Sequence, residues 1–349
     1  MVKKLIIQIP CLNEADTLPA TIADLPRVIP GIDIIEVLVV DDGSRDGTSD
    51  VARSAGVDHI VRLRRNKGLA AAFAAGIDAS LKRGADFIVN TDADNQYSGQ
   101  EIPRLLQPLL NGEADIVIGD RNIAEVKHMS WRKRQLQRLG SWVVRQVSNT
   151  TVPDTTSGFR AYTRDAALRM TIVSEFSYTL ETIIQAGKKR MAIAHVPIAT
   201  NPRTRKSRLF DSVFSYIKQS AATIVRIYAM YEPLKVFSYI GISVVIVGVA
   251  LSLRFVYTWL TESPANLGGR NLQSLFLGGV LMVVGFQIML NGLLADVISA
   301  NRKLLEDLVY RVRSLELPDR NHAINGREDE PRELSKTGAD GRWRSPDSF

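Results

Sequence analysis

Two aspartates, Asp92 and Asp94, follow the apolar run F-I-V at 87–89, within the stretch N-T-D-A-D-N-Q-Y. Extended residues at i and i+2 point the same way, so both carboxylates can face one point, where they repel unless a cation lies between them. Carboxylate oxygens suit Mg²⁺ or Mn²⁺, which binds through few carboxylates and completes its shell with water and phosphates. Such a metal neutralises the charge of a departing nucleoside diphosphate. A lone D-x-D is also common in solvated loops, so its neighbours decide between these interpretations.

Four other polar motifs follow apolar runs that are typical of strands. In an open α/β sheet, ligands bind beyond the carboxyl ends of the strands, so these motifs would gather at one edge. One of them contains D-G-T, which also suits turn and helix-start chemistry, a role compatible with nucleotide binding. The motifs are P-C-L-N-E (Pro10 to Glu14), D-D-G-S-R-D-G-T (Asp41 to Thr48), R-R-N-K-G-L (Arg64 to Leu69) and G-D-R-N (Gly119 to Asn122).

The runs before these motifs are apolar at nearly every position, as in I-I-E-V-L-V-V, which is typical of strands covered on both faces. They alternate with helical patterns, which predicts an α/β fold with a doubly wound, mostly parallel sheet and right-handed crossovers. The predicted strands are Leu5–Ile9, Ile34–Val40, His59–Leu63, Phe87–Thr91 and Asp115–Gly119. The predicted helices lie near Asp16–Val28, Gly47–Ala55, Leu69–Arg83 and Glu101–Leu110.

Two later stretches carry almost no charge. Phe237–Leu253 has no charged residue before Arg254, and Leu275–Ala295 has none. Each approaches the ~20 residues that cross a bilayer, so we predict two transmembrane helices, with buried core helices as the alternative. Basic residues crowd the approach to the first stretch and the exit from the second. By the positive-inside rule, we expect both termini and the catalytic domain in the cytoplasm, at the plasma membrane if the source is prokaryotic.

The chain therefore divides into five predicted parts. Residues 1–207 form a cytoplasmic catalytic domain and residues 208–235 form juxtamembrane amphipathic helices. Residues 236–298 hold the two spans with a short external loop, and residues 299–317 form a cytoplasmic amphipathic helix. The last segment, 318–349, is polar and rich in Pro, Gly, Arg and Asp, which predicts a disordered tail.

The composition of the chain indicates which classes of partner it is suited to bind. The chain has 349 residues, of which 45% are hydrophobic and 23% charged, with a net charge of +7. This charge favours an anionic partner: nucleic acid, a phosphorylated substrate or a membrane surface. Nucleic acid is disfavoured, because the basic residues flank the spans and lack interleaved aromatics on a soluble face. The single cysteine, Cys11, excludes an internal disulfide, and no zinc-like Cys/His grouping or G-x-x-x-x-G-K-[ST] occurs.

Taken in order, P-C-L-N-E, V-V-D-D-G-S-R-D-G-T, R-N-K-G-L, D-A-D-N-Q and D-T-T-S-G-F-R resemble an inverting family 2 glycosyltransferase with a GT-A fold. With two spans after them, they are similar to the polyprenyl-phosphate glycosyltransferases of the dolichyl-phosphate mannosyltransferase type. The resemblance covers roughly residues 4–310. It implies a nucleotide sugar donor, a polyprenyl or dolichyl phosphate acceptor, a Mg²⁺ or Mn²⁺ cofactor, contact with membrane lipids, and a homo-oligomer formed through the spans.

The resemblance also implies donor-site roles position by position. The nucleotide pocket would be lined by Pro10, Asn13, Glu14, Asp41 and Asp42, with Asn66, Lys67 and Gly68 near the nucleotide. The diphosphate and its metal would lie on Asp92, Ala93, Asp94 and Gln96, the last through its amide oxygen.

Acceptor-site roles follow in the same way. The acceptor phosphate would be met by Arg121, Arg134, Gln137, Ser157 and Arg160, although related enzymes often have serine where Gln137 stands. The loop N-P-R-T-R-K-S-R-L-F would close over donor and acceptor phosphates through Arg203, Arg205 and Lys206. Catalysis would rest on Asp154, Asp94 and Arg121, with Asp154 positioning the acceptor or taking a residual proton.

The implied reaction is an in-line displacement in which an acceptor phosphate oxygen attacks the anomeric carbon of a hexose and inverts it. Uridine- and guanosine-diphosphate donors are both compatible with the motifs. One alternative is a processive polysaccharide synthase, which would usually carry more spans and a Q-x-x-R-W motif that this sequence lacks. Another is a catalytically dead, membrane-anchored nucleotide-binding protein on the same scaffold.

Overall fold

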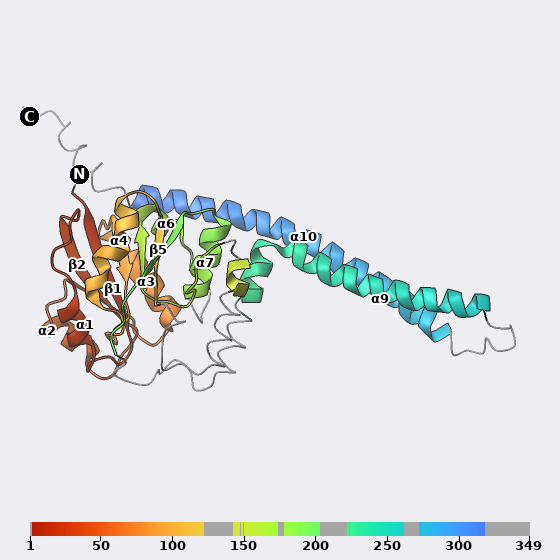
Figure 1. The fold of residues 1–349 in the computed structure, drawn as a ribbon, viewed down its shortest axis with the longest axis horizontal. Helices are drawn as coiled ribbons and strands as arrows, with labels where there is room; N and C mark the ends of the chain where they lie inside the picture. The colour runs from red at the N-terminus through yellow and green to blue at the C-terminus, as the bar shows by residue number, and fades with distance from the viewer. Residues whose placement is uncertain are drawn as a thin grey trace, which may run out of the picture.

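The computed structural model describes residues 2–121, 142–146, 148, 150–173, 178–202, 222, 224–261 and 272–317. These residues form an α/β domain from which two long helices project as a rod (Figure 1). The domain buries its apolar side chains, whereas the rod exposes them. The strands and helices within residues 4–197 therefore build the domain, and the two helices within residues 233–316 build the rod.

A seven-stranded sheet lies at the centre of the domain, in the order β3-β2-β1-β4-β6-β5-β7. All neighbours pair in parallel except β6, which is antiparallel to both β4 and β5. The strands are β1 (Lys4–Cys11), β2 (Ile34–Asp41), β3 (His59–Arg62), β4 (Phe87–Asn90), β5 (Ile116–Asp120), β6 (Arg160–Thr163) and β7 (Ile193–Pro197).

The predicted strands and the mostly parallel sheet are confirmed, with small differences at the strand ends. The sequence patterns did not predict β6 and β7. Because β6 inserts between β4 and β5, the fourth and fifth predicted strands are not neighbours. The register pairs Asn90 with Arg160, which brings the segment before β6 against the carboxyl end of β4.

Helices cover both faces of the sheet. Alternate side chains of β1 enter two separate cores: Leu5 and Ile7 pack with α1, α2 and α4, whereas Ile6 packs with α3, α6 and α7. This burial on both faces explains the continuous apolar runs. The helices are α1 (Leu18–Asp24), α2 (Thr48–Ser54), α3 (Leu69–Lys82), the 3₁₀ turn η1 (Gly99–Glu101), α4 (Ile102–Leu110), α6 (Arg164–Arg169) and α7 (Tyr178–Lys188).

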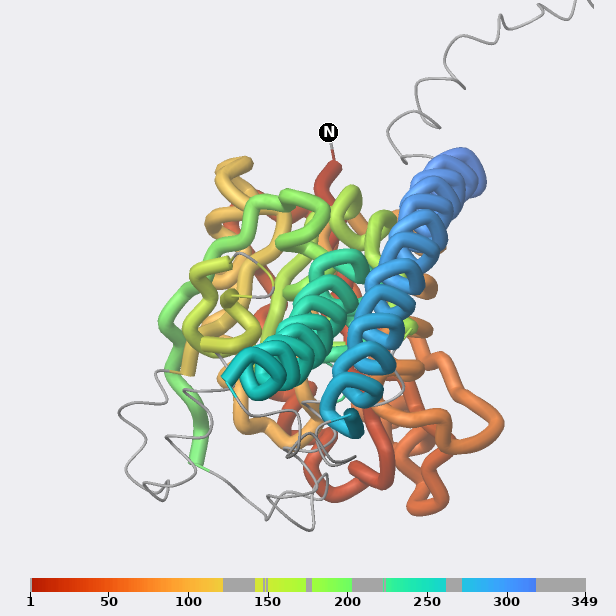
Figure 2. Tube along the Cα trace, turned by 90° about the vertical axis from the view of Figure 1, so that its right-hand side faces the viewer, coloured from red at the N-terminus to blue at the C-terminus, as the bar shows by residue number. Residues whose placement is uncertain are grey.

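The rod consists of α9 (Pro233–Thr261) and α10 (Leu272–Glu316), which lie side by side (Figure 2). Glycines line their contact: a Cβ on Gly241 would come within 2.7 Å of the Gly285 carbonyl oxygen, and one on Gly248 within 2.7 Å of that of Gly278. Small residues at such a seam let helix backbones approach closely, as they do in membranes.

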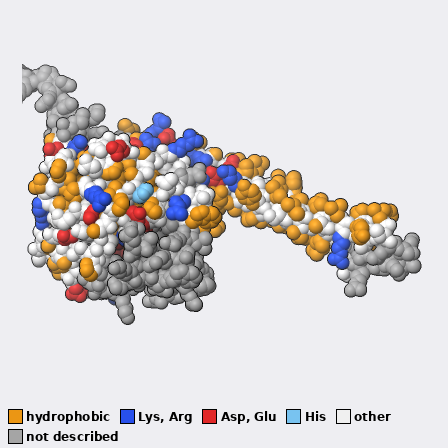
Figure 3. Space-filling model, in the orientation of Figure 1, with side chains coloured by type: hydrophobic (Ala, Val, Ile, Leu, Met, Phe, Trp, Pro, Cys, Tyr) orange, Lys and Arg blue, Asp and Glu red, His pale blue; other side chains and the backbone are white. Residues whose placement is uncertain are grey.

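The surface of the rod is apolar over most of its length (Figure 3). Only 11% and 17% of the most apolar windows of α9 and α10 are buried, so these are not core helices of a soluble domain. Both helices are long and apolar enough to cross a membrane. The second predicted span and the predicted separate helix 299–317 form one continuous helix, α10.

The carboxyl-terminal end of α10 packs along the α/β domain beside α6 (Figure 1). Arg313 donates to the carbonyl oxygens of Leu168 and Met170, at 3.4 and 3.0 Å, at the end of α6. In return, the buried Arg164 of α6 donates to the Leu317 carbonyl just after α10. Each helix end thus has its terminal carbonyls satisfied by an arginine of the other element.

Candidate active site

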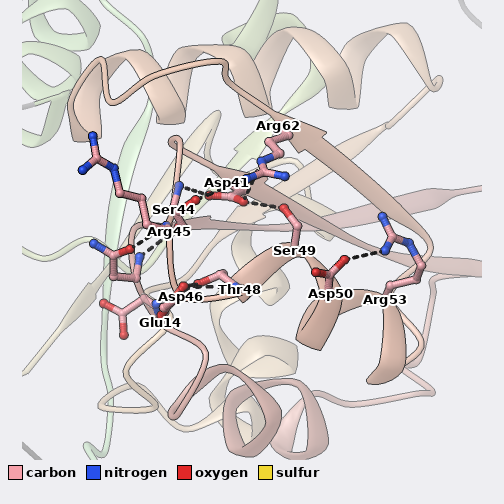
Figure 4. Close-up of polar contacts among 11 residues, drawn as sticks. Glu14, Asp41, Ser44, Arg45, Asp46, Thr48, Ser49, Asp50, Arg53 and Arg62 are labelled. Carbon is pink, nitrogen blue, oxygen red and sulfur yellow. Dashed lines mark hydrogen bonds and ion pairs between the residues drawn. The ribbon is translucent and has the colours of Figure 1, made fainter.

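The loops after β1 and β2 interlock beyond the carboxyl edge of the sheet (Figure 4). The Asn13 N–H donates to Ser44 Oγ at 2.9 Å, and the Arg45 N–H returns a bond to Asn13 Oδ1 at 3.0 Å. The Glu14 N–H donates to Thr48 Oγ1 at 3.0 Å. Side chains of one loop therefore bind the backbone of the other, and the two loops form one wall of the site.

Asp41 lies under this wall with its side chain fully buried. Its carboxylate accepts bonds from the Ser44 N–H at 2.8 Å and from the Ser49 hydroxyl, and it lies 3.6 Å from Arg62 Nε (Figure 4). Pro10 is buried within β1. The sequence prediction did not include Arg62, although its position at the end of β3 indicates it, because ligands gather at strand ends.

Asp42 joins the loops after β2 and β3. Its carboxylate accepts bonds from the backbone N–H groups of Lys67 and Gly68, each at 2.8 Å. Burial raises the pKa of Asp42, and the two N–H donors partly offset this effect. Gly43 has a φ of +76°, and a Cβ there would lie 2.8 Å from the Asn66 nitrogen, so the loops meet this closely only with glycine. The Lys67 side chain is exposed at this edge.

Asp92 and Asp94 follow β4 and lie half-buried in the same region. Burial, followed by the Asp94 charge, raises the pKa of Asp92 to about 7, while Arg121 opposes the rise. Asp94 accepts two bonds from Gln96, one from its backbone N–H at 3.2 Å and one from Nε2 at 2.7 Å. The Gln96 amide nitrogen thus holds Asp94, and the contact of the Gln96 amide oxygen with a metal stays a prediction.

Gly158 forms the wall behind Asp92. A Cβ at this position would lie 2.9 Å from Asp92 Oδ1 and 3.0 Å from the Tyr178 hydroxyl, which leaves no room for a side chain. The Gly158 N–H also donates to the Tyr97 hydroxyl at 3.1 Å. Gly158, the glycine of D-T-T-S-G-F-R, is therefore required for the Asp92 carboxylate to occupy this position.

The residues present fit a divalent cation of the Mg²⁺ or Mn²⁺ type. Within the described ranges no group of three or more His, Cys, Asp or Glu side chains converges. Burial and then the charge of Asp94 raise the pKa of Asp92, and two such neighbouring carboxylates suit a metal whose shell is completed by water and phosphate. Ala93, between them, is buried, and its carbonyl accepts the Thr21 hydroxyl at 2.9 Å, so it supports the loop.

Arg121 and Asp154 form a two-point ion pair next to this region. Arg121 Nε and Nη2 donate to the two Asp154 oxygens at 2.7 and 3.0 Å, and Thr156 Oγ1 accepts from Nη2 at 2.9 Å. Burial alone would raise the pKa of Asp154, but the Arg121 charge and these bonds lower it below its ordinary value. Asp154 is therefore a carboxylate at neutral pH. Thr156 was not in the predicted set, although it lies within D-T-T-S-G-F-R.

The structure places Ser157 and Arg160 differently from their predicted contact with an acceptor phosphate, since both are fully buried. Arg160 donates to the carbonyl oxygens of Thr155, Ser157 and Thr179 and to the Thr182 hydroxyl. The side chain is fully buried and four of its five N–H groups bind these oxygens, so Arg160 holds the loop before β6. The predicted contacts of Arg134, Gln137, Arg203, Arg205 and Lys206 lie outside the described residues.

Comparison with known proteins agrees with this arrangement. Residues 6–170 match the model of the family "Glycosyl transferase family 2". An undecaprenyl-phosphate mannosyltransferase of Micrococcus luteus is 32% identical over 200 residues, which cover 54% of this chain and 80% of that protein. The chain belongs to glycosyl transferase family 2. It is therefore a glycosyltransferase, and the family resemblance of its motifs is confirmed.

Other relatives extend the match. The polyprenol monophosphomannose synthase of Mycolicibacterium smegmatis is 29% identical and covers 58% of this chain and 78% of its own length. Glycosyltransferase AglJ of Haloferax volcanii is 27% identical and covers 88% of this chain and 96% of its own length. The glucosyl-3-phosphoglycerate synthase of Mycobacterium tuberculosis, crystallised with Mn²⁺, UDP-glucose and phosphoglyceric acid, superposes with a TM-score of 0.54 at 21% identity, over 65% of this chain and 80% of that one. This likeness shows the shared GT-A fold.

Proposed function

We propose that this glycosyltransferase moves a hexose from a uridine- or guanosine-diphosphate sugar to polyprenyl phosphate, with inversion, at the cytoplasmic side of a membrane. One observation carries the proposal: the Arg121–Asp154 pair lies within electrostatic reach of the Asp92–Asp94 pair at the same sheet edge. A cation-binding carboxylate pair suits a nucleoside diphosphate, and an arginine beside it suits a second phosphate group. Two relatives whose names specify polyprenyl-phosphate mannosyl transfer support the acceptor class.

The donor half of the site would use the wall of loops after β1, β2 and β3. Asp41 and Asp42 would support the pocket for base and ribose from beneath, through the loop backbones that they bind. The exposed Arg62 and Lys67, at and after the end of β3, would meet the phosphates. A Mg²⁺ or Mn²⁺ ion on Asp92 and Asp94, when bound, would neutralise charge on the departing diphosphate. The structures of the glucosyl-3-phosphoglycerate synthase with Mn²⁺ or Mg²⁺ support this cofactor class.

The acceptor half would use Arg121. A phosphate monoester has a second pKa of about 6, so it is mostly a dianion at neutral pH and needs little deprotonation before it attacks. It does need its charge offset, because two phosphate groups must approach each other. Arg121 keeps part of its side chain exposed while Asp154 fixes its guanidinium at two points. We infer that Asp154 orients Arg121 and does not act as a strong base.

The rod indicates that the transfer reaction would take place at a membrane surface. A long prenyl chain stays in the bilayer, so the acceptor phosphate emerges at the membrane surface, where the catalytic domain must reach it. The apolar surfaces of α9 and α10 suit a hydrocarbon environment. Basic residues such as Lys235, before the first apolar run, and Arg302, after the second, favour a cytoplasmic domain.

The test uses the full chain purified in detergent, with a short-chain polyprenyl phosphate, Mn²⁺, and a panel of UDP- and GDP-sugars. Mass spectrometry detects lipid-linked sugar. We expect a product from one donor, loss of that product in Asp94→Asn, and no effect of Asp50→Asn, which removes an exposed carboxylate from α2. Absence of product from every donor, with the nucleotide still bound, would favour the catalytically dead alternative.

A further inference from the structure

The loop that carries Asp94 is held by a segment more than a hundred residues later in the chain. After β7, the chain passes the end of β5, where the Ile198 N–H donates to the Asp120 carbonyl at 2.9 Å. It then reaches the loop after β4, where Thr200 forms an antiparallel bridge with Tyr97. This bridge lies outside the seven-stranded sheet.

Asn201 makes two contacts with the same loop. Its backbone N–H donates to the Gln96 carbonyl at 2.9 Å, and its side-chain Nδ2 donates to the Asn95 carbonyl at 3.0 Å. Two consecutive peptide carbonyls of the Asp94 loop are therefore bound by one asparagine. Asparagine and glutamine are the two residue types with a side-chain amide donor, and only asparagine has this length.

The two bound peptides set the conformation that orients Asp94. Asn95, next to Asp94, has a φ of +53°, in the left-handed region that non-glycine residues seldom adopt. That turn brings both donors of Gln96, the backbone N–H and Nε2, back onto the Asp94 carboxylate. A backbone in a sparsely populated region persists when its surroundings hold it in place. Asn201 binds the peptide that follows Asn95 and the next peptide along the chain, and so holds this turn from its carboxyl-terminal side.

We propose that Asn201 is a positioning residue for the metal site, which acts by fixing the Asn95 turn that directs Asp94 toward Asp92. The inference rests on the proposed function only in taking this carboxylate pair as the cation site. Outer contacts that orient ligating carboxylates typically change metal affinity about 10- to 100-fold when they are removed. Asn201 reaches Asp94 through Gln96, so its loss weakens metal binding and leaves the nucleotide pocket after β1 and β2 intact.

The experiment measures binding of Mn²⁺ by electron paramagnetic resonance, without turnover, on the full chain in detergent. Titrations use Mn²⁺ alone, then Mn²⁺ with UDP or with GDP. Asn201→Ala removes the side-chain donor, and Asn201→Asp keeps the shape but replaces the donor with an oxygen facing the Asn95 carbonyl. Should the alanine variant fail to fold, the aspartate variant still tests the donor. Asn111→Ala is the matched control, because Asn111 is exposed just after α4 and its side-chain amide donates to Glu113 at 3.1 Å, away from the site.

We expect both Asn201 variants to bind Mn²⁺ about 10-fold more weakly, with Asn111→Ala unchanged. The affinity of both Asn201 variants for nucleotide without metal, measured by calorimetry, should equal that of the wild type. A general loosening of the fold would lower this affinity as well. Wild-type Mn²⁺ affinity in both Asn201 variants would overturn this inference and leave the proposed function standing. A wild-type protein that binds no Mn²⁺ under any of these conditions would overturn the metal assignment and the inference together.

Discussion

Replacing Asp154 with asparagine tests whether this residue orients Arg121 or acts as a base. The side chain of Asp154 is 1% exposed and that of Arg121 is 23% exposed. The variant removes the negative charge and directs an amide N–H₂ group at one of the two arginine donors, so one hydrogen bond becomes a repulsion. Removing one partner of a buried pair costs about 3–5 kcal/mol.

We expect the lower end of that range, about 3 kcal/mol, because Arg121 retains some contact with solvent. For a domain of about 200 residues, each kcal/mol shifts Tm by about 2–4 °C, so Tm should fall by about 6–12 °C. Thermal unfolding followed by intrinsic fluorescence measures this shift, with Asp50→Asn as the exposed control. A fall of under about 2 °C would contradict the structural importance of the pair.

The pH dependence separates the two catalytic roles. The pKa of Asp154 is lowered in the folded protein, so its stabilising effect is present above the ordinary aspartate pKa and is lost as pH falls through the lower folded value. Between pH 6 and 9, we therefore expect Asp154→Asn to lower kcat about 100-fold or more without changing the shape of the pH profile. Loss of an acid limb in the variant would refute this reasoning and identify Asp154 as a titrating base. Near-full turnover would exclude Asp154 from catalysis.

Three further predictions concern the metal site and the docked helix. Gly158→Ala should displace Asp92, since the added Cβ would lie 2.9 Å from Oδ1, and should weaken Mn²⁺ binding at least 10-fold in a resonance titration; unchanged binding would show that the wall can yield. Because the pKa of Asp92 is raised to about 7, protons compete for it below that pH, and Mn²⁺ affinity should rise from pH 6 to pH 8; an affinity that is flat over this range would contradict the shift. Arg313→Ala removes the donor to the Leu168 and Met170 carbonyls, at a cost of about 1–3 kcal/mol, and hydrogen exchange should become faster at the end of α10; exchange at the wild-type rate would mean that other contacts hold this helix.

Local pattern was sufficient to predict a large part of this protein. Apolar runs such as Ile34–Val40 predicted the strands because side-chain periodicity and burial are written in adjacent residues. The charge-free stretches predicted two apolar helices for the same reason. The rule that ligands meet the carboxyl ends of strands then gathered the motifs at one edge, where the structure has Asp41, Asp42, Asp92 and Asp94.

The arrangement within that edge depended on the order of the strands. Arg160 carries the charge expected of a phosphate ligand, and nothing near it in the sequence indicates that three carbonyls and a hydroxyl enclose it. The insertion of β6 between β4 and β5 decides this, because it buries the segment before β6 under the sheet edge. The same insertion brings Gly158 against Asp92.

By itself, then, the sequence determined five of the seven strands, the apolar helices, the family and most of the polar residues at the strand ends. Only the tertiary structure decided which of them meet. Arg121 and Asp154 are 33 positions apart, and Asn201 is 106 positions from Asn95. Contacts over such separations leave no periodic signal, because they depend on sheet order and loop path, which many distant interactions fix together. The orientation of a carboxylate, and therefore the chemistry that it can perform, depends on such long-range contacts.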